Sequence, residues 1–297
     1  MKIATTYLGI GLAALLVAVV PVVASYQIAK QDSFSFQTGQ LEAVASDLAR
    51  RANETGLQLA KARDEINSGE FGPPESASEI QHLRSLALTS TYLQAVGRTR
   101  GTKILCTSMG KLNPPVDLGP PDIITVHSVH IWLNITLGFT GEATYHALES
   151  EGCIVFIAPN LILDTFSDQP NLSMAVVTGA SNKVLSIKGT IESKWRQMLG
   201  SAQKATWVDD QNIIAMERCK DVDIIAVVSQ PLRHAYSRIT IAAMISLPIG
   251  AAIGVMMAIY VFRAGRKQHT LPYVLKMAVK NSEFFMNYQP VTDLASG

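Results

Sequence analysis

The chain has 297 residues, of which 48% are hydrophobic and 16% charged, and its formal net charge is +1. Soluble proteins average about 25% charged residues, so this chain is poor in charge, and its mean hydropathy is +0.20. This composition excludes a disordered regulator, which would be rich in charge, and a basic nucleic-acid binder, which needs a cationic excess. We therefore expect no nucleic-acid partner and a mostly soluble chain with one or two membrane segments.

Two runs without charge account for the apolar surplus, Ile3–Ala24 and Ile239–Phe262. A membrane helix needs about 20 apolar residues to cross a hydrocarbon core of roughly 30 Å. We therefore expect membrane helices over residues 1–25 and 239–262. A cleaved secretory signal is the alternative for the first run, because small residues precede Ser25, but the apolar stretch is longer than is usual for such a signal.

Basic residues flank the second run unequally. Arg263, Arg266 and Lys267 follow it directly, and an excess of Lys and Arg marks the cytoplasmic side of a membrane segment. We therefore expect residues 263–297 inside the cell and residues 26–238 outside the cytoplasm as one domain.

The first part of this domain is expected to be helical. Apolar residues recur at helical spacing over Ser33–Ser68, which is either a helix packed on its own domain or a dimer helix that continues the first span. A second helix is expected over Ala77–Val96. Ser76 or Ser78 can cap it, Ser78 with Gln81 fits a capping box, and Gly97 is a natural stop.

The rest of the domain is rich in short strand-like runs. A loop is expected around the four prolines between Pro114 and Pro121, and a short helix over Thr190–Leu199. We therefore expect an α+β domain, with N-terminal helices followed by a mainly antiparallel sheet. The expected strands are Lys103–Ser108, Ile123–Phe139, Cys153–Ala158, Ser173–Val177, Lys183–Ile187 and Ile224–Val228.

No catalytic motif stands out between the two runs. The sequence contains no nucleophile elbow, zinc-protease motif, phosphate loop or dinucleotide fingerprint. His127 and His130 lie three apart in an expected strand, which sends them to opposite faces. We therefore expect no catalytic residue, no metal site and no cofactor in this chain.

Three cysteines lie between the two runs, Cys106, Cys153 and Cys219. Disulfides persist in compartments outside the cytoplasm, so all three are candidates for a disulfide or a redox role. Because three is an odd number, one intramolecular bridge at most can form. The alternative is that all three are small buried apolar residues.

The segment Glu79–Gly110 combines a helix containing Leu83-Arg84, the stretch Tyr92–Gly97, and a strand that ends in Cys106-Thr107-Ser108. It resembles the periplasmic CSS-motif domain of bacterial cyclic-di-GMP phosphodiesterases, where the last motif reads Cys-Ser-Ser. In that family this cysteine is thought to pair with one about thirty residues upstream, and here the region Gly72–Ser76 holds no cysteine. The resemblance places residues 26–238 in the periplasm and the chain in the inner membrane.

The C-terminal segment carries a second motif. Glu283 is followed by Tyr288-Gln289-Pro290 and then by Asp293-Leu294, with Gly297 at the end. This looks like the opening of an EAL domain, which is a TIM-like barrel and needs about 250 residues. By resemblance Gln289 lies near the bound dinucleotide, whereas the family's catalytic residues and its Mg or Mn ligands would lie beyond Gly297.

Together these features indicate a membrane-bound sensor that regulates cyclic-di-GMP hydrolysis by an EAL domain. The expected input is the redox state of Cys106, with thiol-disulfide enzymes or proteases as periplasmic partners. The expected output is a change in a homodimer, for which Gly250-x-x-x-Gly254 offers a packing face. Two alternatives stay open, a periplasmic small-ligand sensor and a truncated, non-catalytic regulatory relic.

Overall fold

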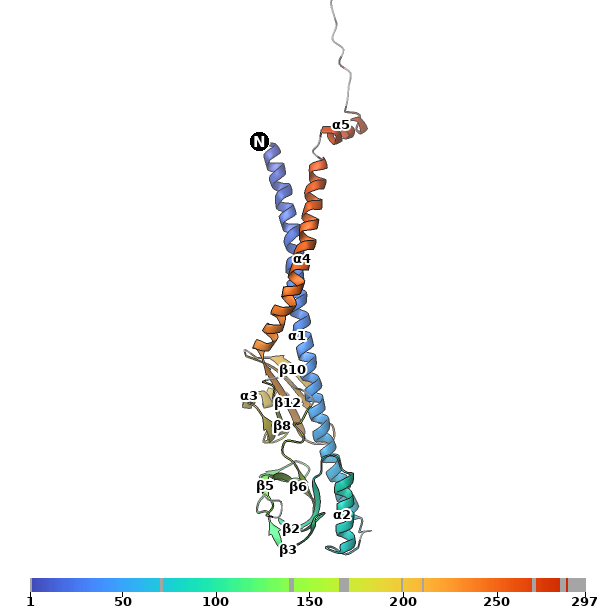
Figure 1. The fold of residues 1–297 in the computed structure, drawn as a ribbon, viewed down its shortest axis with the longest axis vertical. Helices are drawn as coiled ribbons and strands as arrows, with labels where there is room; N and C mark the ends of the chain where they lie inside the picture. The colour runs from blue at the N-terminus through green and yellow to red at the C-terminus, as the bar shows by residue number, and fades with distance from the viewer. Residues whose placement is uncertain are drawn as a thin grey trace, which may run out of the picture. The chain divides into compact units, whose positions relative to one another are not determined.

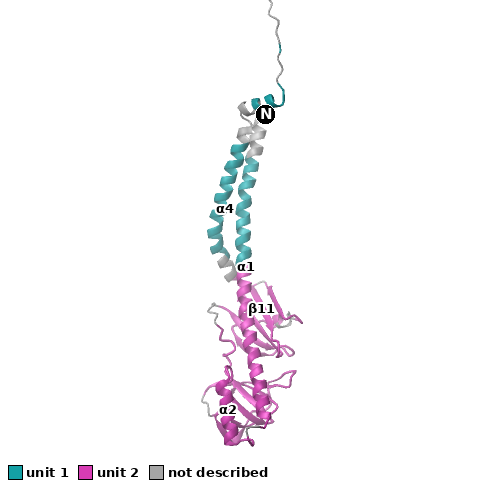
Figure 2. Cartoon of the chain, turned by 90° about the vertical axis from the view of Figure 1, so that its right-hand side faces the viewer, with its two compact units in different colours: residues 1–33, 237–297 teal, residues 34–236 magenta. Residues whose placement is uncertain are grey.

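A computed structural model describes residues 2–69, 72–138, 142–165, 171–198, 200–209, 211–268, 271–283 and 287. The chain forms two compact units, which are described separately (Figure 2). One unit contains residues 34–236. The other contains residues 1–33 and 237–297, and thus both apolar runs.

Helix α1 runs without a break from Lys2 to Asn67 (Figure 1). The helix expected over Ser33–Ser68 is therefore the second part of a longer helix that begins in the first apolar run. In the larger unit, α1 buries one face, on which Leu41, Leu48 and Leu59 are at most 4% exposed. This face belongs to the main hydrophobic core.

Helix α2 spans Ala77–Thr89, and Ser76 is its N-cap. The Ser76 side chain accepts a hydrogen bond from the Glu79 backbone N–H at 3.2 Å, and the Glu79 carboxylate accepts the backbone N–H of Glu75 at 2.5 Å. The helix is therefore capped by Ser76, and the expected capping box of Ser78 with Gln81 was wrong.

The expected continuation of α2 to Val96 was also wrong. Ser90 leaves the helix with an extended backbone, and strand β1 follows over Ala95–Arg100. Gly97 lies in this strand instead of ending a helix. A Cβ atom at Gly97 would lie 2.6 Å from the carbonyl oxygen of Cys106, so the close approach of β1 to the next strand requires glycine.

Seven antiparallel strands form the first sheet, in the order β3-β2-β1-β7-β6-β5-β4. Strand β3, which contains Pro114 and Pro115, was expected to be a loop. It lies at the edge of the sheet, where a missing N–H is tolerated. Besides β1, the strands are β2 Lys103–Thr107, β3 Gly110–Asp117, β4 Ile123–Ile124, β5 His130–Thr136, β6 Thr144–Ser150 and β7 Cys153–Ile157.

Five antiparallel strands form a second sheet, in the order β10-β11-β12-β8-β9. Helix α3, Ser193–Met198, contributes Trp195 to a small core with Ile214 and Val227 of this sheet. The strands are β8 Ser173–Thr178, β9 Val184–Lys188, β10 Lys204–Val208, β11 Asn212–Arg218 and β12 Ile224–Pro231.

The larger unit is thus an α+β domain with antiparallel sheets, which confirms the expected fold class. The sequence predicted one sheet, whereas the structure has two, and both contribute to a main core with α1 and α2. This core includes Leu48 of α1, Leu83 of α2, Val155 of the first sheet and Val176 of the second, all four fully buried. Figure 1 shows both sheets beside α1.

The smaller unit contains two apolar helices, the first part of α1 and most of helix α4, which spans Leu232–Gln268. By length and composition, both are long enough and apolar enough to cross a membrane. Helix α5, Leu271–Lys280, follows α4. The EAL-like motif around Gln289 lies outside the described residues.

Candidate functional site

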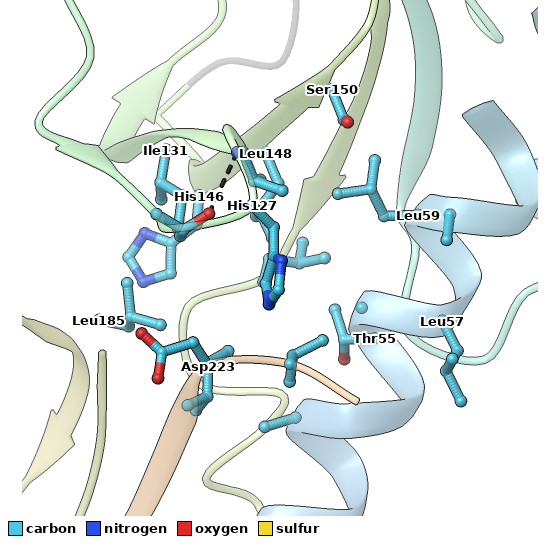
Figure 3. A pocket seen from close by; sticks show the side chains of 18 of the residues that line it. Thr55, Leu57, Leu59, His127, Ile131, His146, Leu148, Ser150, Leu185 and Asp223 are labelled. Carbon is cyan, nitrogen blue, oxygen red and sulfur yellow. Dashed lines mark hydrogen bonds between the residues drawn. The ribbon is translucent and has the colours of Figure 1, made fainter. Parts of the chain in front are cut away.

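The larger unit contains a cavity of about 290 Å³. Its walls come from α1, from the turn between β4 and β5, from strands β5, β6, β7 and β9, and from the connection between β11 and β12. Figure 3 shows side chains from these elements pointing into one space. Because residues of both sheets and of α1 form the walls, this cavity lies where the main parts of the unit meet.

Most of the cavity wall is aliphatic. Leu59 of α1, Ile131 and Leu148 of the first sheet, and Leu185 of the second sheet all line it. Small-molecule sites are usually concave and mainly apolar, with a few polar groups that fix orientation. The cavity has this character, so its few polar side chains are the groups that can orient a ligand.

His146 is a buried polar member of the wall, at 3% exposure. Its Nδ1 accepts the backbone N–H of Asn134 at 3.1 Å, so its proton lies on Nε2, which is 3.1 Å from Ser186 Oγ. The Ser186 hydroxyl donates in turn to the carbonyl of Pro159 at 2.9 Å. Burial lowers the pKa of His146, because it disfavours the charged ring.

Two aspartates lie at the connection between β11 and β12 and line the cavity. Asp223 Oδ2 accepts the backbone N–H of Ala180 at 2.8 Å, and its Oδ1 lies 3.4 Å from Arg218 Nη1. Asp221 Oδ2 accepts a hydrogen bond from the side-chain amide of Asn53 at 2.8 Å. Figure 3 shows the Asp223 carboxylate on the side of the cavity where Leu185 lies.

His127 lies in the turn between β4 and β5, and its ring projects into the cavity (Figure 3). Ser128 adopts a positive φ of 56°, and the backbone N–H of Val129 bonds to Thr125 Oγ1 at 3.1 Å. The prediction that His127 lies in a strand was wrong. His130 begins β5 and bonds Glu149 at 2.6 Å. Among the described residues, no group of three or more His, Cys, Asp or Glu side chains could hold a metal ion.

Cys106 and Cys153 occupy strands on either side of β1. In the strand register, Arg98 of β1 lies opposite Cys106 of β2 on one side and opposite Cys153 of β7 on the other. Neighbouring strands lie about 4.8 Å apart, so the Cα atoms of these cysteines are separated by about 9.6 Å. A disulfide needs a Cα separation below about 7 Å, so this register does not permit a bridge.

Cys219 follows β11 in the other sheet and donates to the carbonyl of Ala49 at 3.1 Å. All three cysteines are buried and free. Burial raises the pKa of Cys106 to about 11 and the pKa values of Cys153 and Cys219 to about 12. The expected disulfide is therefore not supported, and the structure favours the alternative of three buried thiols.

The sequence also matches a family model described as "CSS motif domain associated with EAL", over residues 38–242. The chain belongs to this family. It is also 23% identical over 291 residues to the probable cyclic di-GMP phosphodiesterase PdeB of Escherichia coli (strain K12), with 95% of this chain and 55% of that protein covered. The chain thus spans about half the length of this curated relative.

Solved structures show a weaker likeness. The extracellular domain of the putative histidine kinase rpHK1S-Z16 matches with a TM-score of 0.48 and 14% identity, covering 69% of this chain and 98% of that one. The sensory domain of the Campylobacter jejuni chemoreceptor Tlp3 (CcmL) matches with a TM-score of 0.41 and 9% identity, covering 71% of this chain and 99% of that one.

The motif that gives the CSS family its name reads Cys106-Thr107-Ser108 here and lies at the end of β2. The Thr107 side chain accepts the backbone N–H of Met109 at 3.2 Å, and the Ser108 carbonyl accepts Arg84 Nε of α2 at 3.0 Å. The Cys106 thiol lies 3.9 Å from a carboxylate oxygen of Glu79. The motif thus joins the end of β2 to helix α2.

Neither the cavity nor the role of Glu79 was predicted from the sequence. The cavity is assembled from segments that are distant in the chain, so no local pattern marks it. Glu79 could have been found, because Ser76-x-x-Glu79 is itself a capping-box pattern. The glycines of the expected packing motif lie on α4, where a Cβ atom at Gly250 would meet Pro21 and Ser25, and one at Gly254 would meet Ala18.

Proposed function

We propose that this chain is the membrane-anchored sensory region of a cyclic-di-GMP phosphodiesterase, and that its input is a small molecule bound in the cavity. The input domain lies in the bacterial periplasm, and both apolar helices cross the inner membrane. Binding changes how the two helices pack and thereby regulates cyclic-di-GMP hydrolysis by an EAL domain in the cytoplasm.

The observation that carries this proposal is the connection between the cavity and the apolar helices. The cavity wall includes several residues of α1 between Ala52 and Arg63, and the same helix contains the first apolar run. The wall also includes Ile224, the first residue of β12, and this strand leads directly into α4 at Leu232. A ligand that shifts either wall therefore acts on an element continuous with an apolar helix.

The output is proposed from the family and from the relative PdeB, whose name gives it as a probable cyclic di-GMP phosphodiesterase. Hydrolysis of a phosphodiester by metal-assisted chemistry uses divalent ions to activate water and to stabilise charge. We propose Mg or Mn for the complete EAL domain and a homodimer as the signalling form.

The thiols do not support a redox input. A thiolate is the reactive form of cysteine, and burial holds Cys106, Cys153 and Cys219 in the protonated form. The register of β2, β1 and β7 also keeps Cys106 and Cys153 apart. A small-molecule input therefore fits the domain better than a disulfide switch.

The membrane topology can be tested with reporter fusions in cells. Alkaline phosphatase fused after Ser150 is expected to be active, because the enzyme needs disulfides that form outside the cytoplasm. Green fluorescent protein fused after Lys280 is expected to fluoresce. An inactive phosphatase at Ser150 would contradict a periplasmic input domain.

The cavity can be tested with 2-phenylethanol, a neutral compound with an apolar body and one polar group. We expect ligand-observed NMR to show its binding to the purified chain in lipid nanodiscs. The variant Ala60→Phe, which fills the cavity from α1, should abolish this binding. Ala43→Phe on an exposed position of the same helix is the matched control and should retain it.

A further inference from the structure

We infer that the ligand of this cavity is a small apolar compound with one amine or other cationic group, and that Asp223 and Asp221 bind this group. The inference rests on the proposed function, since it names the chemistry of the ligand that the cavity would sense. Its basis is the distribution of charge around an otherwise aliphatic wall.

Three charged side chains line the cavity, Arg63, Asp221 and Asp223. Arg63 on α1 is paired with Asp64, whose Oδ1 lies 2.8 Å from Arg63 Nη2. Its positive charge is therefore balanced by a neighbour on the same helix. The remaining charge on the wall is negative and comes from the two aspartates.

The protein balances the aspartates only in part. Asp223 lies 3.4 Å from Arg218 Nη1, at the long end of hydrogen-bond distances, and Arg218 also donates to the Gly200 carbonyl at 3.0 Å. Asp221 bonds the neutral amide of Asn53. Each carboxylate oxygen accepts two hydrogen bonds, so both groups retain acceptor capacity for an ammonium donor.

Among the other polar groups of the wall, the His127 ring projects into the cavity, whereas His146 and Thr55 have their donors engaged within the protein. His146 is buried and uncharged, and its ring nitrogens already face Asn134 and Ser186. Thr55 Oγ1 donates to the Arg51 carbonyl at 2.8 Å. A carboxylate ligand would therefore meet two aspartates without a free cation in the described wall, and like charges at close range repel.

The aliphatic walls fix the other end of the ligand. Leu59, Leu148 and Leu185 line the same cavity as Asp223 (Figure 3). A volume of about 290 Å³ accommodates a single ring or a branched chain. Burial of the ligand's apolar surface contributes to the affinity without fixing the ligand's direction. The aspartates at the connection between β11 and β12 then orient the ligand.

Three probes with the same ring and different head groups test this inference: 2-phenylethylamine, 2-phenylethanol and phenylacetate. Their dissociation constants are measured by ligand-observed NMR on the 297-residue chain in nanodiscs at pH 7. We expect the amine to bind about tenfold more tightly than the alcohol, because it gains a charge-assisted contact, and the carboxylate to bind most weakly.

Two variants test whether the aspartates cause the preference for the amine over the alcohol. Asp223→Asn should weaken binding of the amine more than binding of the alcohol and so remove the preference for the amine. Since Asp223 also accepts a backbone N–H, Asp221→Asn at the exposed rim provides a second variant and should reduce the preference without affecting the fold. Asp117→Asn, on the exposed edge strand β3, is the matched control and should keep the preference of the native chain.

The outcomes separate the two proposals. Binding of the alcohol or the carboxylate as tight as that of the amine would overturn the cationic ligand and leave the cavity as a binding site. Binding of none of the three probes would overturn the small-molecule input itself. A preference for the amine that persists in both aspartate variants would also contradict the inference.

Discussion

Glu79 of α2 and Arg98 of β1 form an ion pair between the helix and the first sheet, in which Arg98 Nε donates to Glu79 Oε1. Glu79 is 3% exposed, and Arg98 also donates to the Ile66 carbonyl of α1 at 3.1 Å. The pair therefore joins α1, α2 and β1, the strand that lies between Cys106 of β2 and Cys153 of β7.

The variant Glu79→Gln should destabilise the larger unit. It removes the carboxylate and leaves the Arg98 guanidinium partly buried without its partner, which typically costs about 3–5 kcal/mol for a fully buried pair. Because the Arg98 side chain is 20% exposed, we expect a loss of about 2–3 kcal/mol.

Urea unfolding followed by tryptophan fluorescence measures this loss, because all three tryptophans lie in the larger unit. Glu192→Gln is the matched control, since the carboxylate of Glu192 pairs with exposed Lys194. The control should unfold at the midpoint of the native chain. Equal midpoints for Glu79→Gln and Glu192→Gln would contradict a stabilising role for the buried pair.

The three thiols should react slowly in the folded chain. With a pKa of about 11 for Cys106 and about 12 for Cys153 and Cys219, about one thiol in a thousand or fewer is ionised at pH 8. We expect iodoacetamide to modify the native chain at least tenfold more slowly than the urea-unfolded chain. Mass mapping of protein from the periplasmic side that finds a bridge between any two cysteines would contradict this account.

His146 should make the stability of the larger unit depend on pH. Its folded-state pKa is lowered below the ordinary value of about 6.5, so the unfolded chain binds a proton more readily as the pH falls past that value. The free energy of unfolding should then fall with decreasing pH, by up to about 1.4 kcal/mol per pH unit, until the folded-state pKa is reached.

Urea unfolding at pH 7.5 and 5.5 measures this dependence. His146→Gln should show a smaller decline than the native chain, because the glutamine does not titrate. His127→Gln, in the exposed turn, should decline as the native chain does. If the two variants decline equally, His146 is not the group responsible.

The apolar helices can be tested at Gly254. A Cβ atom there would meet the backbone of Ala18 on α1, whereas one at Gly11 would meet nothing within 4 Å. Gly254→Leu should therefore disturb the pair of helices in the smaller unit, and Gly11→Leu should not. Thermal unfolding in detergent measures the difference, and equal effects of both variants would show that the α1–α4 contact is absent.

The sequence predicted the strongly patterned elements well. The charge-free runs, the start of α2 and strands such as β7 and β8 follow from hydropathy and β-branched residues. Strand β1 was not predicted because Gly97 suggests the end of a helix. Glycine is needed there because the backbone of Cys106 approaches it closely, which the sequence alone does not reveal. Strand β3 was missed because its prolines are tolerated only at an edge position, which the sequence alone does not reveal.

The candidate site was the least predictable feature. The split into two sheets depends on pairings such as β8 with β12, whose residues lie far apart in the chain. His127 lines the cavity from a turn in which Ser128 adopts a positive φ. The strand-like pattern of this segment did not predict that turn. The cysteines were visible in the sequence, but only the register around Arg98 shows that Cys106 and Cys153 cannot pair.

We propose that the cavity, and not a disulfide, is the input of this sensory domain. The most direct test measures cyclic-di-GMP in cells whose native gene carries Ala60→Phe, Ala43→Phe or Cys106→Ser. We predict that Ala60→Phe changes the cyclic-di-GMP level at least twofold, whereas Ala43→Phe and Cys106→Ser leave it at the level of the native gene. An unchanged level in Ala60→Phe together with a changed level in Cys106→Ser would contradict the account.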